Sequence, residues 1–111
     1  PITAMNASIS HVLEVRPNSR VALFCSHRSP LLSQLSLPPD TIFLTGDDLV
    51  PSAQDTLWLM SQCRHHVFLN SSLYWWGAFF SQLNYIIDEQ LIFAANNFIN
   101  QSCYIDGWRK F

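Results

Sequence analysis

The chain has 111 residues, of which 49% are hydrophobic and 13% are charged, and its formal net charge is −2. This length fits one domain with a hydrophobic core. The basic residues are few and scattered, which excludes the continuous basic surface that binds a nucleic-acid backbone, so we expect no nucleic-acid partner. No apolar run approaches the roughly 18–20 residues that cross a bilayer, so we expect no membrane span within this segment.

The metal-binding residue types do not form a recognisable metal pattern. The spacing of Cys25, Cys63 and Cys103 matches no zinc motif, and we interpret the three cysteines as buried thiols. Asp47 and Asp48 follow a glycine and are typical of turn residues. We therefore expect no bound metal.

The first half of the chain alternates between helical and strand patterns. Residues 3–15 carry apolar side chains at helical spacing, and the proline at position 17 ends this helix. Residues 21–25 and 41–44 are short apolar runs typical of buried strands. Residues 31–36 between them predict a short helix, and residues 45–48 predict a turn.

The central stretch contains the most informative residues. A helix is predicted over residues 55–64, with the Asp55 carboxylate placed to cap its first turn. The short apolar run 67–69 predicts a buried strand. Asn70, Ser71 and Ser72 then offer three good capping residues before a second helix, predicted over residues 71–83.

The C-terminal part is less regular. Residues 84–89 fit either a helix extension or a loop, residues 91–95 predict a further strand, and the aromatic tail 96–111 has no clear period. This order predicts an α/β fold, a Rossmann-like parallel sheet with helices on both faces, formed by residues 1–111 as a single domain. Ligands of such sheets bind beyond the carboxyl ends of the strands, and a helix start suits a phosphate, so the Asn-Ser-Ser turn is the candidate site.

Residues 70–78 (Asn-Ser-Ser-Leu-Tyr-Trp-Trp-Gly-Ala) carry a resemblance to a known family. They resemble the carboxyl-terminal motif of the α-1,2-fucosyltransferases, usually Asn-Ser-Ser/Thr-Phe-Ser-Trp-Trp-Gly/Ala-Ala. Residues 55–65 resemble the family's Asp…Leu-Met-x-x-Cys-x-His helix. Residues 41–47 and 91–96 resemble its neighbouring strands, and Trp108 resembles a tryptophan near the family's C-terminus.

The resemblance implies a specific function. Such enzymes have two Rossmann-type lobes in a GT-B-like arrangement, and this chain is similar to the C-terminal lobe that binds GDP-fucose. They transfer fucose to the 2-hydroxyl of a terminal galactose with inversion and without a metal. By resemblance, Ser71 and Ser72 would contact the donor diphosphate and Asp55 would lie near the nucleoside, and Asn70 is also a donor-binding residue. Tyr74, Trp75 and Trp76 would contact either the other lobe or a sugar.

The resemblance also sets expectations about the whole protein. The chain begins at Pro1, and we expect it to be part of a longer chain with an N-terminal lobe. The family's His-x-Arg-x-Gly-Asp motif, whose arginine grips the diphosphate, has no counterpart here, so we expect this segment alone to be inactive. The partners implied are GDP-fucose and a galactose-terminated glycan. The location implied is the lumenal side of the Golgi membrane for a eukaryotic protein and the cytoplasm for a bacterial one.

Three points stay open at this level. The chain could be a truncated or diverged relative that binds without catalysing, or a lobe of another nucleotide-sugar glycosyltransferase. No catalytic residue or general base can be assigned. Serines at a helix start are also common as simple caps, and tryptophans are common in cores.

Overall fold

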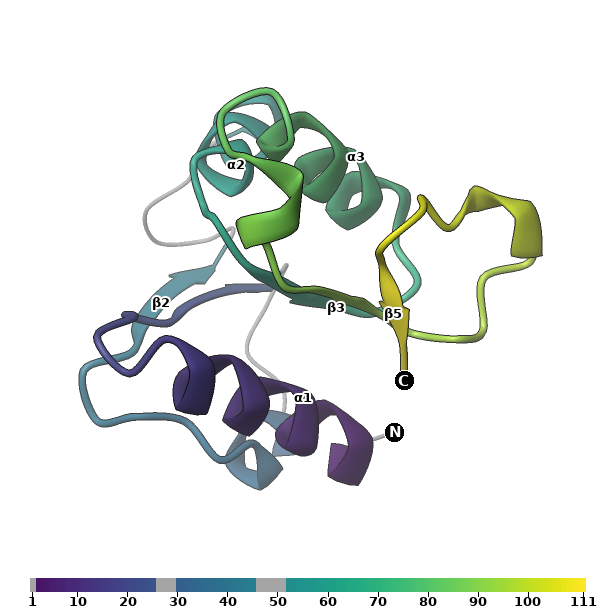
Figure 1. The fold of residues 1–111 in the computed structure, drawn as a ribbon. Coiled ribbons are helices and arrows are strands. Elements are labelled where there is room, and N and C mark those ends of the chain that lie inside the picture. The colour runs from purple at the N-terminus through teal and green to yellow at the C-terminus, as the bar shows by residue number, and fades with distance from the viewer. Residues whose placement is uncertain (1, 26–29, 46–51) are drawn as a thin grey trace. The chain divides into compact units, whose positions relative to one another are not determined.

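A computed structural model describes residues 2–25, 30–45 and 52–111 (Figure 1). The predicted turn residues Asp47 and Asp48 lie outside the described residues. Contacts within the chain divide it into two compact units, residues 2–56 and residues 57–111. The expectation of one domain stays a prediction.

The unit of residues 2–56 contains one long helix and one pair of parallel strands. Its elements are α1 (Ile2–Val15), β1 (Ala22–Cys25), the short helix η1 (Pro30–Gln34) and β2 (Ile42–Thr45). β1 and β2 pair in parallel from Ala22 opposite Ile42 to Cys25 opposite Thr45. The short helix predicted over 31–36 is instead a 3₁₀ helix that ends at Gln34. Short connectors between elements often adopt 3₁₀ geometry, and the Ser33 hydroxyl donates to the Pro30 carbonyl oxygen within this one.

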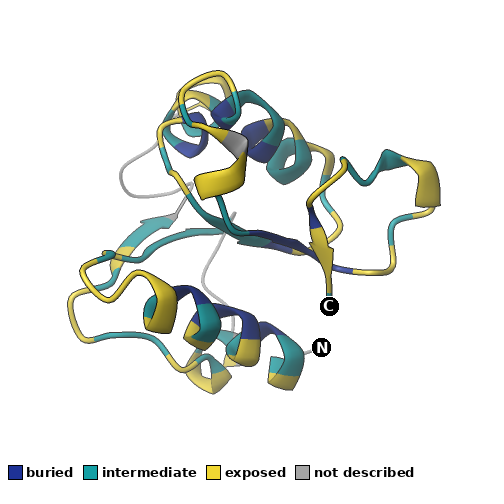
Figure 2. Cartoon of the chain, in the orientation of Figure 1, coloured by how far each residue is buried: buried dark blue, intermediate teal, exposed yellow. Residues whose placement is uncertain are grey.

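Helix α1 follows the sequence prediction closely. Its buried residues include Met5, Ile9 and Val12, which lie on one side of the helix (Figure 2). On the same helix, the Asn6 side-chain amide donates to the Gln34 carbonyl oxygen and its oxygen accepts from the Ser36 amide. These two hydrogen bonds connect α1 to the end of η1.

Helix α2 (Ala53–Ser61) differs from the predicted span 55–64 at both ends. It begins two residues earlier because Ser52 is its cap: the Ser52 hydroxyl accepts from the Asp55 amide and donates to the Asp55 carboxylate. It ends at Ser61, where the amides of Gln62 and Cys63 donate to the carbonyl oxygens of Leu59 and Met60, the tighter i→i−3 pattern that closes many helices. Asp55 therefore lies in the first turn as predicted, but the capping hydroxyl belongs to a serine.

The unit of residues 57–111 contains a three-stranded parallel sheet. Its elements after α2 are β3 (His66–Phe68), α3 (Ser72–Ser81), η2 (Ile87–Glu89), β4 (Ile92–Ala94), η3 (Gln101–Cys103) and β5 (Arg109–Lys110). The strand order is β3-β4-β5, and both pairings are parallel. The α/β class with parallel sheets is confirmed and is compatible with a Rossmann-like fold. The short strand β5 was not predicted, and α3 ends at Ser81, two residues before the predicted end.

The core of this unit joins the sheet to α3. Its buried cluster consists of Phe68, Ala78, Ile92, Ala94 and Trp108. The Phe68 and Trp108 rings meet edge to face with centroids 5.7 Å apart. Tyr74, Trp75 and Phe79 of α3 pack against the same cluster. The C-terminal tryptophan is therefore part of the core that holds α3 against β3 and β4.

Gly77 allows α2 and α3 to approach each other closely. A Cβ atom at position 77 would lie 2.7 Å from the Met60 Cβ and 2.9 Å from the Met60 sulfur. A side chain at position 77 of α3 would therefore collide with Met60, a buried residue of α2. This contact gives a packing reason for the glycine that follows the two tryptophans. None of the described helices is both long enough and apolar enough to cross a membrane.

Candidate functional site

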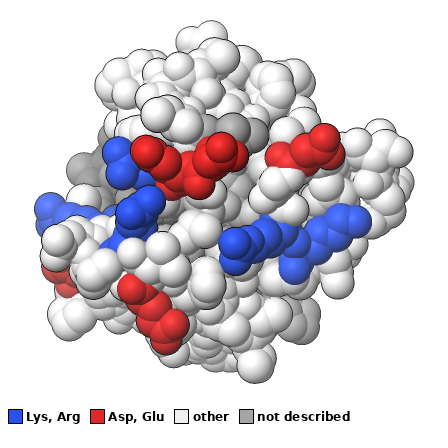
Figure 3. Space-filling view, viewed as in Figure 1, with Lys and Arg blue, Asp and Glu red and all other residues white. Residues whose placement is uncertain are grey.

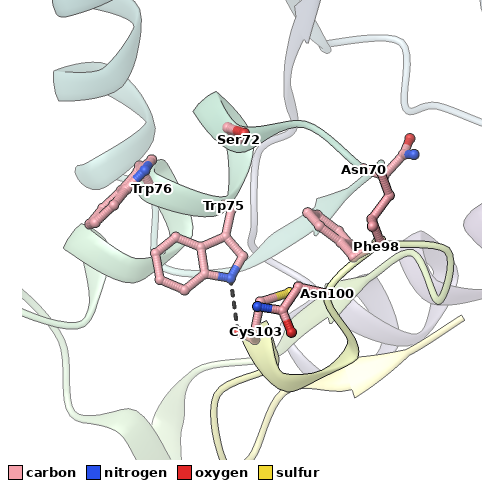
Figure 4. A pocket seen from close by; sticks show the side chains of 8 residues that line it. Asn70, Ser72, Trp75, Trp76, Phe98, Asn100 and Cys103 are labelled. Atoms are coloured by element: carbon pink, nitrogen blue, oxygen red, sulfur yellow. Dashed lines mark hydrogen bonds between the residues drawn. The ribbon is translucent and has the colours of Figure 1, made fainter.

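A pocket with a volume of about 410 Å³ lies in the unit of residues 57–111 (Figure 4). Its walls combine large apolar side chains with uncharged polar ones. It is lined by Asn70, Ser72, Trp75, Trp76, Phe98, Ile99, Asn100 and Cys103. A mostly apolar cavity with a few converging polar groups is the usual form of a small-molecule site.

The pocket lies at the carboxyl ends of two neighbouring strands. Asn70 follows the end of β3, and Phe98 to Asn100 follow the end of β4. The last paired residues of these strands, Phe68 and Ala94, lie opposite each other, so both loops leave the sheet at the same edge. This is where ligands of open parallel α/β sheets bind. The structure thus brings the predicted Asn-Ser-Ser turn together with a loop that the sequence did not single out.

The start of α3 forms one side of the pocket. Ser71 is the N-cap residue, with extended backbone angles, and its carbonyl oxygen accepts the Trp75 amide at 3.0 Å. One of the three predicted capping residues, Ser71, does occupy the N-cap position, but its hydroxyl makes no cap hydrogen bond. Ser72, the first helical residue, is exposed and lines the pocket. The first amides of a helix have no partner within it, so they are available to a ligand at this position.

Trp75 is held rigidly beside the pocket. Its Nε1 donates to the Cys103 carbonyl oxygen at 2.9 Å, the bond drawn in Figure 4. Its ring stacks on Phe79 with centroids 5.2 Å apart and planes 9° from parallel. The hydrogen bond crosses from α3 to η3 and joins the two sides of the site.

The other two aromatic residues of the motif have different environments. Trp76 lines the pocket, remains 46% exposed, and stacks against Phe80. Tyr74 is half-buried against the core cluster and is not among the described residues that line the pocket. Of the three residues predicted to contact a sugar or the other lobe, only the two tryptophans reach this cavity.

Asp55 is placed in the first turn of α2, in the unit of residues 2–56. It is exposed, and its carboxylate accepts the Ser52 hydroxyl at 2.9 Å. This contact accounts for a carboxylate at the helix start without any ligand. The predicted role of Asp55 near a nucleoside stays a prediction.

Sequence reasoning missed half of the pocket. Phe98, Ile99, Asn100 and Cys103 all come from the tail that showed no periodicity. Asn100 caps η3, where its side-chain oxygen accepts the Ser102 amide at 2.9 Å. The signal that could have found this loop is its position directly after the apolar strand segment 91–95, since ligand-binding loops follow parallel strands.

The described residues that line the pocket carry no charge. Figure 3 shows the charged side chains of one face as small separate groups of either sign among large uncharged areas. Ser72 and Asn100 can offer hydrogen bonds and Trp75 offers apolar surface, but none of these side chains can neutralise a diphosphate.

Cys63 and His66 are engaged in structural hydrogen bonds. His66 Nε2 donates to the Cys63 carbonyl oxygen at 2.8 Å, and the Cys63 thiol donates to the Leu59 carbonyl oxygen at 3.5 Å. Burial lowers the pKa of His66 to about 4, with a smaller contribution from nearby His65, and burial raises the pKa of the Cys63 thiol. Among the described residues, no three His, Cys, Asp or Glu side chains gather closely enough to hold a metal ion.

Comparisons of the chain with protein-family models, with curated proteins and with solved structures give no match. Membership of the fucosyltransferase family therefore stays a prediction from the motif. The assignment of donor-binding residues also stays a prediction.

Proposed function

We propose that this chain is the donor-binding part of a glycosyltransferase that moves L-fucose from GDP-fucose to the 2-hydroxyl of a terminal galactose. The proposal joins the sequence resemblance of residues 70–78 to one structural observation. This observation is the pocket at the carboxyl edge of β3 and β4, which contains Asn70 and Ser72 at the start of α3.

The chemistry of the helix start supports an anionic leaving group. The free amides of the first turn and the positive end of the helix dipole favour negative charge. The Ser71 hydroxyl is not used for capping, so it can donate to a phosphate oxygen. When the fucose–phosphate bond breaks, charge develops on GDP, and donors already in position stabilise it without rearranging.

The same site explains why the segment alone is expected to be inactive. No described lining residue is charged, and one helix start supplies only partial charge against a diphosphate. The proposed enzyme needs an arginine from a further part of the chain, consistent with the absence of the family's arginine motif here. Binding of GDP by residues 1–111 should therefore be weak but selective.

The decisive experiment is calorimetric titration of this chain with GDP, GDP-fucose and UDP. We expect GDP and GDP-fucose to bind and UDP to bind much less. Equal binding of all three nucleotides would indicate a different nucleotide-sugar enzyme. Absence of binding by a chain with a cooperative unfolding transition would contradict the proposal for this segment.

A double variant tests the assigned residues. Replacing Ser71 and Ser72 together by Ala should weaken GDP binding about tenfold, because two hydroxyl donors to a charged group are lost. Fold stability should change little, since neither hydroxyl has a hydrogen-bond partner among the described residues. Ser10→Ala, an exposed serine on α1, is the matched control. Unchanged GDP affinity in the double variant would remove these serines from the site.

A further inference from the structure

We infer that Asn100 is a site of N-linked glycosylation and that the fold excludes this modification at Asn6. The sequence contains three Asn-X-Ser acceptor motifs, at Asn6, Asn70 and Asn100. Such a motif is a modification site only where the folded chain exposes it, because the attached glycan is bulky and hydrated. The three motifs have different environments in the structure, and these environments separate them.

The modification is a group transfer from an oligosaccharide carried on a lipid diphosphate. The side-chain amide nitrogen of asparagine bonds to the anomeric carbon of the sugar and gives one proton to water. The bond from that carbon to the phosphate oxygen breaks, and the lipid diphosphate leaves with the electron pair. The transfer takes place on the lumenal side of the secretory pathway, so only this location rests on the family resemblance.

The motif at Asn100 is open to an enzyme. Asn100, Gln101 and Ser102 are all exposed. The Asn100 side-chain oxygen accepts the Ser102 amide at 2.9 Å, whereas its nitrogen makes no hydrogen bond to another described residue. The reacting nitrogen is therefore available while the other end of the side-chain amide is fixed.

The motif at Asn6 is closed by helix α1. The Asn6 side-chain nitrogen donates to the Gln34 carbonyl oxygen at 3.0 Å, and its oxygen accepts the Ser36 amide at 2.9 Å. Ser8, whose hydroxyl completes the motif, is only 5% exposed and donates to the Ala4 carbonyl oxygen. A glycan on Asn6 would displace the contact with Gln34, and an enzyme could reach Ser8 only after this part of the helix unwinds.

The motif at Asn70 is less open than the one at Asn100. Asn70 is exposed, but Ser71 is half-buried and Ser72 is the first residue of the ten-residue helix α3. By contrast, Ser102 lies in η3, which is a single turn of three residues. We therefore expect Asn70 to stay unmodified in the folded chain.

The surroundings of Asn100 can accommodate a glycan. The neighbouring Ile99 side chain is fully exposed, at 103%, and a glycan attached one residue away would cover this apolar surface. Figure 4 shows Asn100 and Ser72 at opposite ends of the group of pocket residues. Modification of Asn100 therefore leaves the groups at the start of α3 unchanged.

The test uses the folded, unmodified chain 1–111 with a purified single-subunit eukaryotic oligosaccharyltransferase and a lipid-diphosphate oligosaccharide. We expect the intact mass to increase by one oligosaccharide. Peptide N-glycosidase then removes the glycan and leaves aspartate at the modified position, which peptide mapping should locate at Asn100. Absence of transfer, or transfer to Asn6 or Asn70 in place of Asn100, would overturn the inference.

Variants of Ser102 separate loss of the motif from loss of the fold. Ser102→Ala removes the hydroxyl that the enzyme requires but keeps the backbone amide that binds the Asn100 side chain, so transfer should be lost. Ser102→Thr keeps the motif and should keep the transfer. Asn97→Gln changes an exposed asparagine outside the three motifs and is the matched control. Transfer to Ser102→Ala at the wild-type level would contradict the assignment.

A peptide of residues 2–12 tests the exclusion of Asn6. A helix of this length is marginal by itself in water, so the motif is open in the peptide and should be modified. Modification of the peptide, without modification of Asn6 in the folded chain, would show that the fold protects this motif. A peptide that is not modified would contradict protection by the fold.

These results are separable from the proposed function, because the titrations with GDP use the unmodified chain. GDP binding without transfer to Asn100 would overturn the inference and leave the donor proposal standing. Transfer to Asn100 without GDP binding would support the inference and contradict the donor proposal.

Discussion

Strands β1 and β4 are both short and apolar, but they differ in burial. In β4 all three residues are buried, and the strand has a parallel neighbour on each side. In β1 all four residues are only half-buried, and the strand pairs with β2. Both are short apolar runs, Ile-Phe-Ala and Ala-Leu-Phe-Cys. The apolar sequence therefore identified both strands. It could not show that β4 is a central strand and that β1 has a single described neighbour.

The largest expected difference is in stability, between alanine variants of two phenylalanines that each lie in a parallel strand. Phe68→Ala in β3 should lower the free energy of unfolding by about 3–5 kcal/mol, because the ring is buried against Trp108. Phe24→Ala in β1 should cost less, on the order of 1–2 kcal/mol, because the ring is only half-buried. Urea unfolding followed by far-UV circular dichroism compares the two variants.

Tryptophan fluorescence adds a control for this comparison. All four tryptophans lie in residues 57–111, so their emission reports unfolding of that unit. Phe68→Ala should shift the fluorescence transition strongly. A larger shift from Phe24→Ala would contradict the difference in burial on which the comparison depends.

Much of the fold could be predicted because periodicity reports local structure. The apolar spacing of Met5, Ile9 and Val12 identified α1. The proline after Arg16 explains why that helix stops. β5 was not predictable in the same way. Its two residues, Arg109 and Lys110, are exposed and charged, and they form a strand only because β4 lies beside them.

The next prediction concerns how the stability of the unit of residues 57–111 depends on pH. Burial lowers the pKa of His66 from 6.5 to about 4, so the folded state favours the neutral ring. The stabilisation is complete above pH 6.5 and is lost as the pH falls toward 4, because the unfolded chain takes up the proton first. Each pKa unit corresponds to about 1.4 kcal/mol, so the loss is on the order of 3 kcal/mol.

His66→Gln tests this prediction, since glutamine can still donate to the Cys63 carbonyl oxygen. The variant should lose less stability than the wild type between pH 7 and pH 4.5 in urea titrations. Carboxylates that titrate in this range affect both proteins alike. His11→Gln on α1 is the control for removing one imidazole. Parallel curves for the wild type and His66→Gln would show that this ring does not carry the dependence.

The candidate site was only partly predictable for a physical reason. Asn70 and Ser72 lie in a local pattern of capping residues between a strand and a helix, so the sequence indicated them. Phe98 and Asn100 reach the pocket because β3 and β4 pair in parallel, which is a contact between distant segments. The failure of Ser71 to cap with its side chain was also invisible, because the rotamer depends on the completed turn.

The smallest expected effects compare two residues at the start of α2. Ser52→Ala and Asp55→Ala each break the reciprocal capping contact, so each should cost about 1 kcal/mol of stability. Their effects on GDP binding should differ if the resemblance is correct. Asp55→Ala should then weaken binding, and Ser52→Ala should leave it unchanged.

This pair distinguishes a structural carboxylate from a ligand-binding one, because both variants disturb the same helix start by a similar amount. Thermal melts measure the capping loss, and calorimetry with GDP measures the binding loss on the same samples. Equal GDP affinity in both variants would leave capping as the whole role of Asp55. Weaker binding in Asp55→Ala alone would require the carboxylate to reach the nucleotide, since the two variants share the lost cap and differ only in the lost charge.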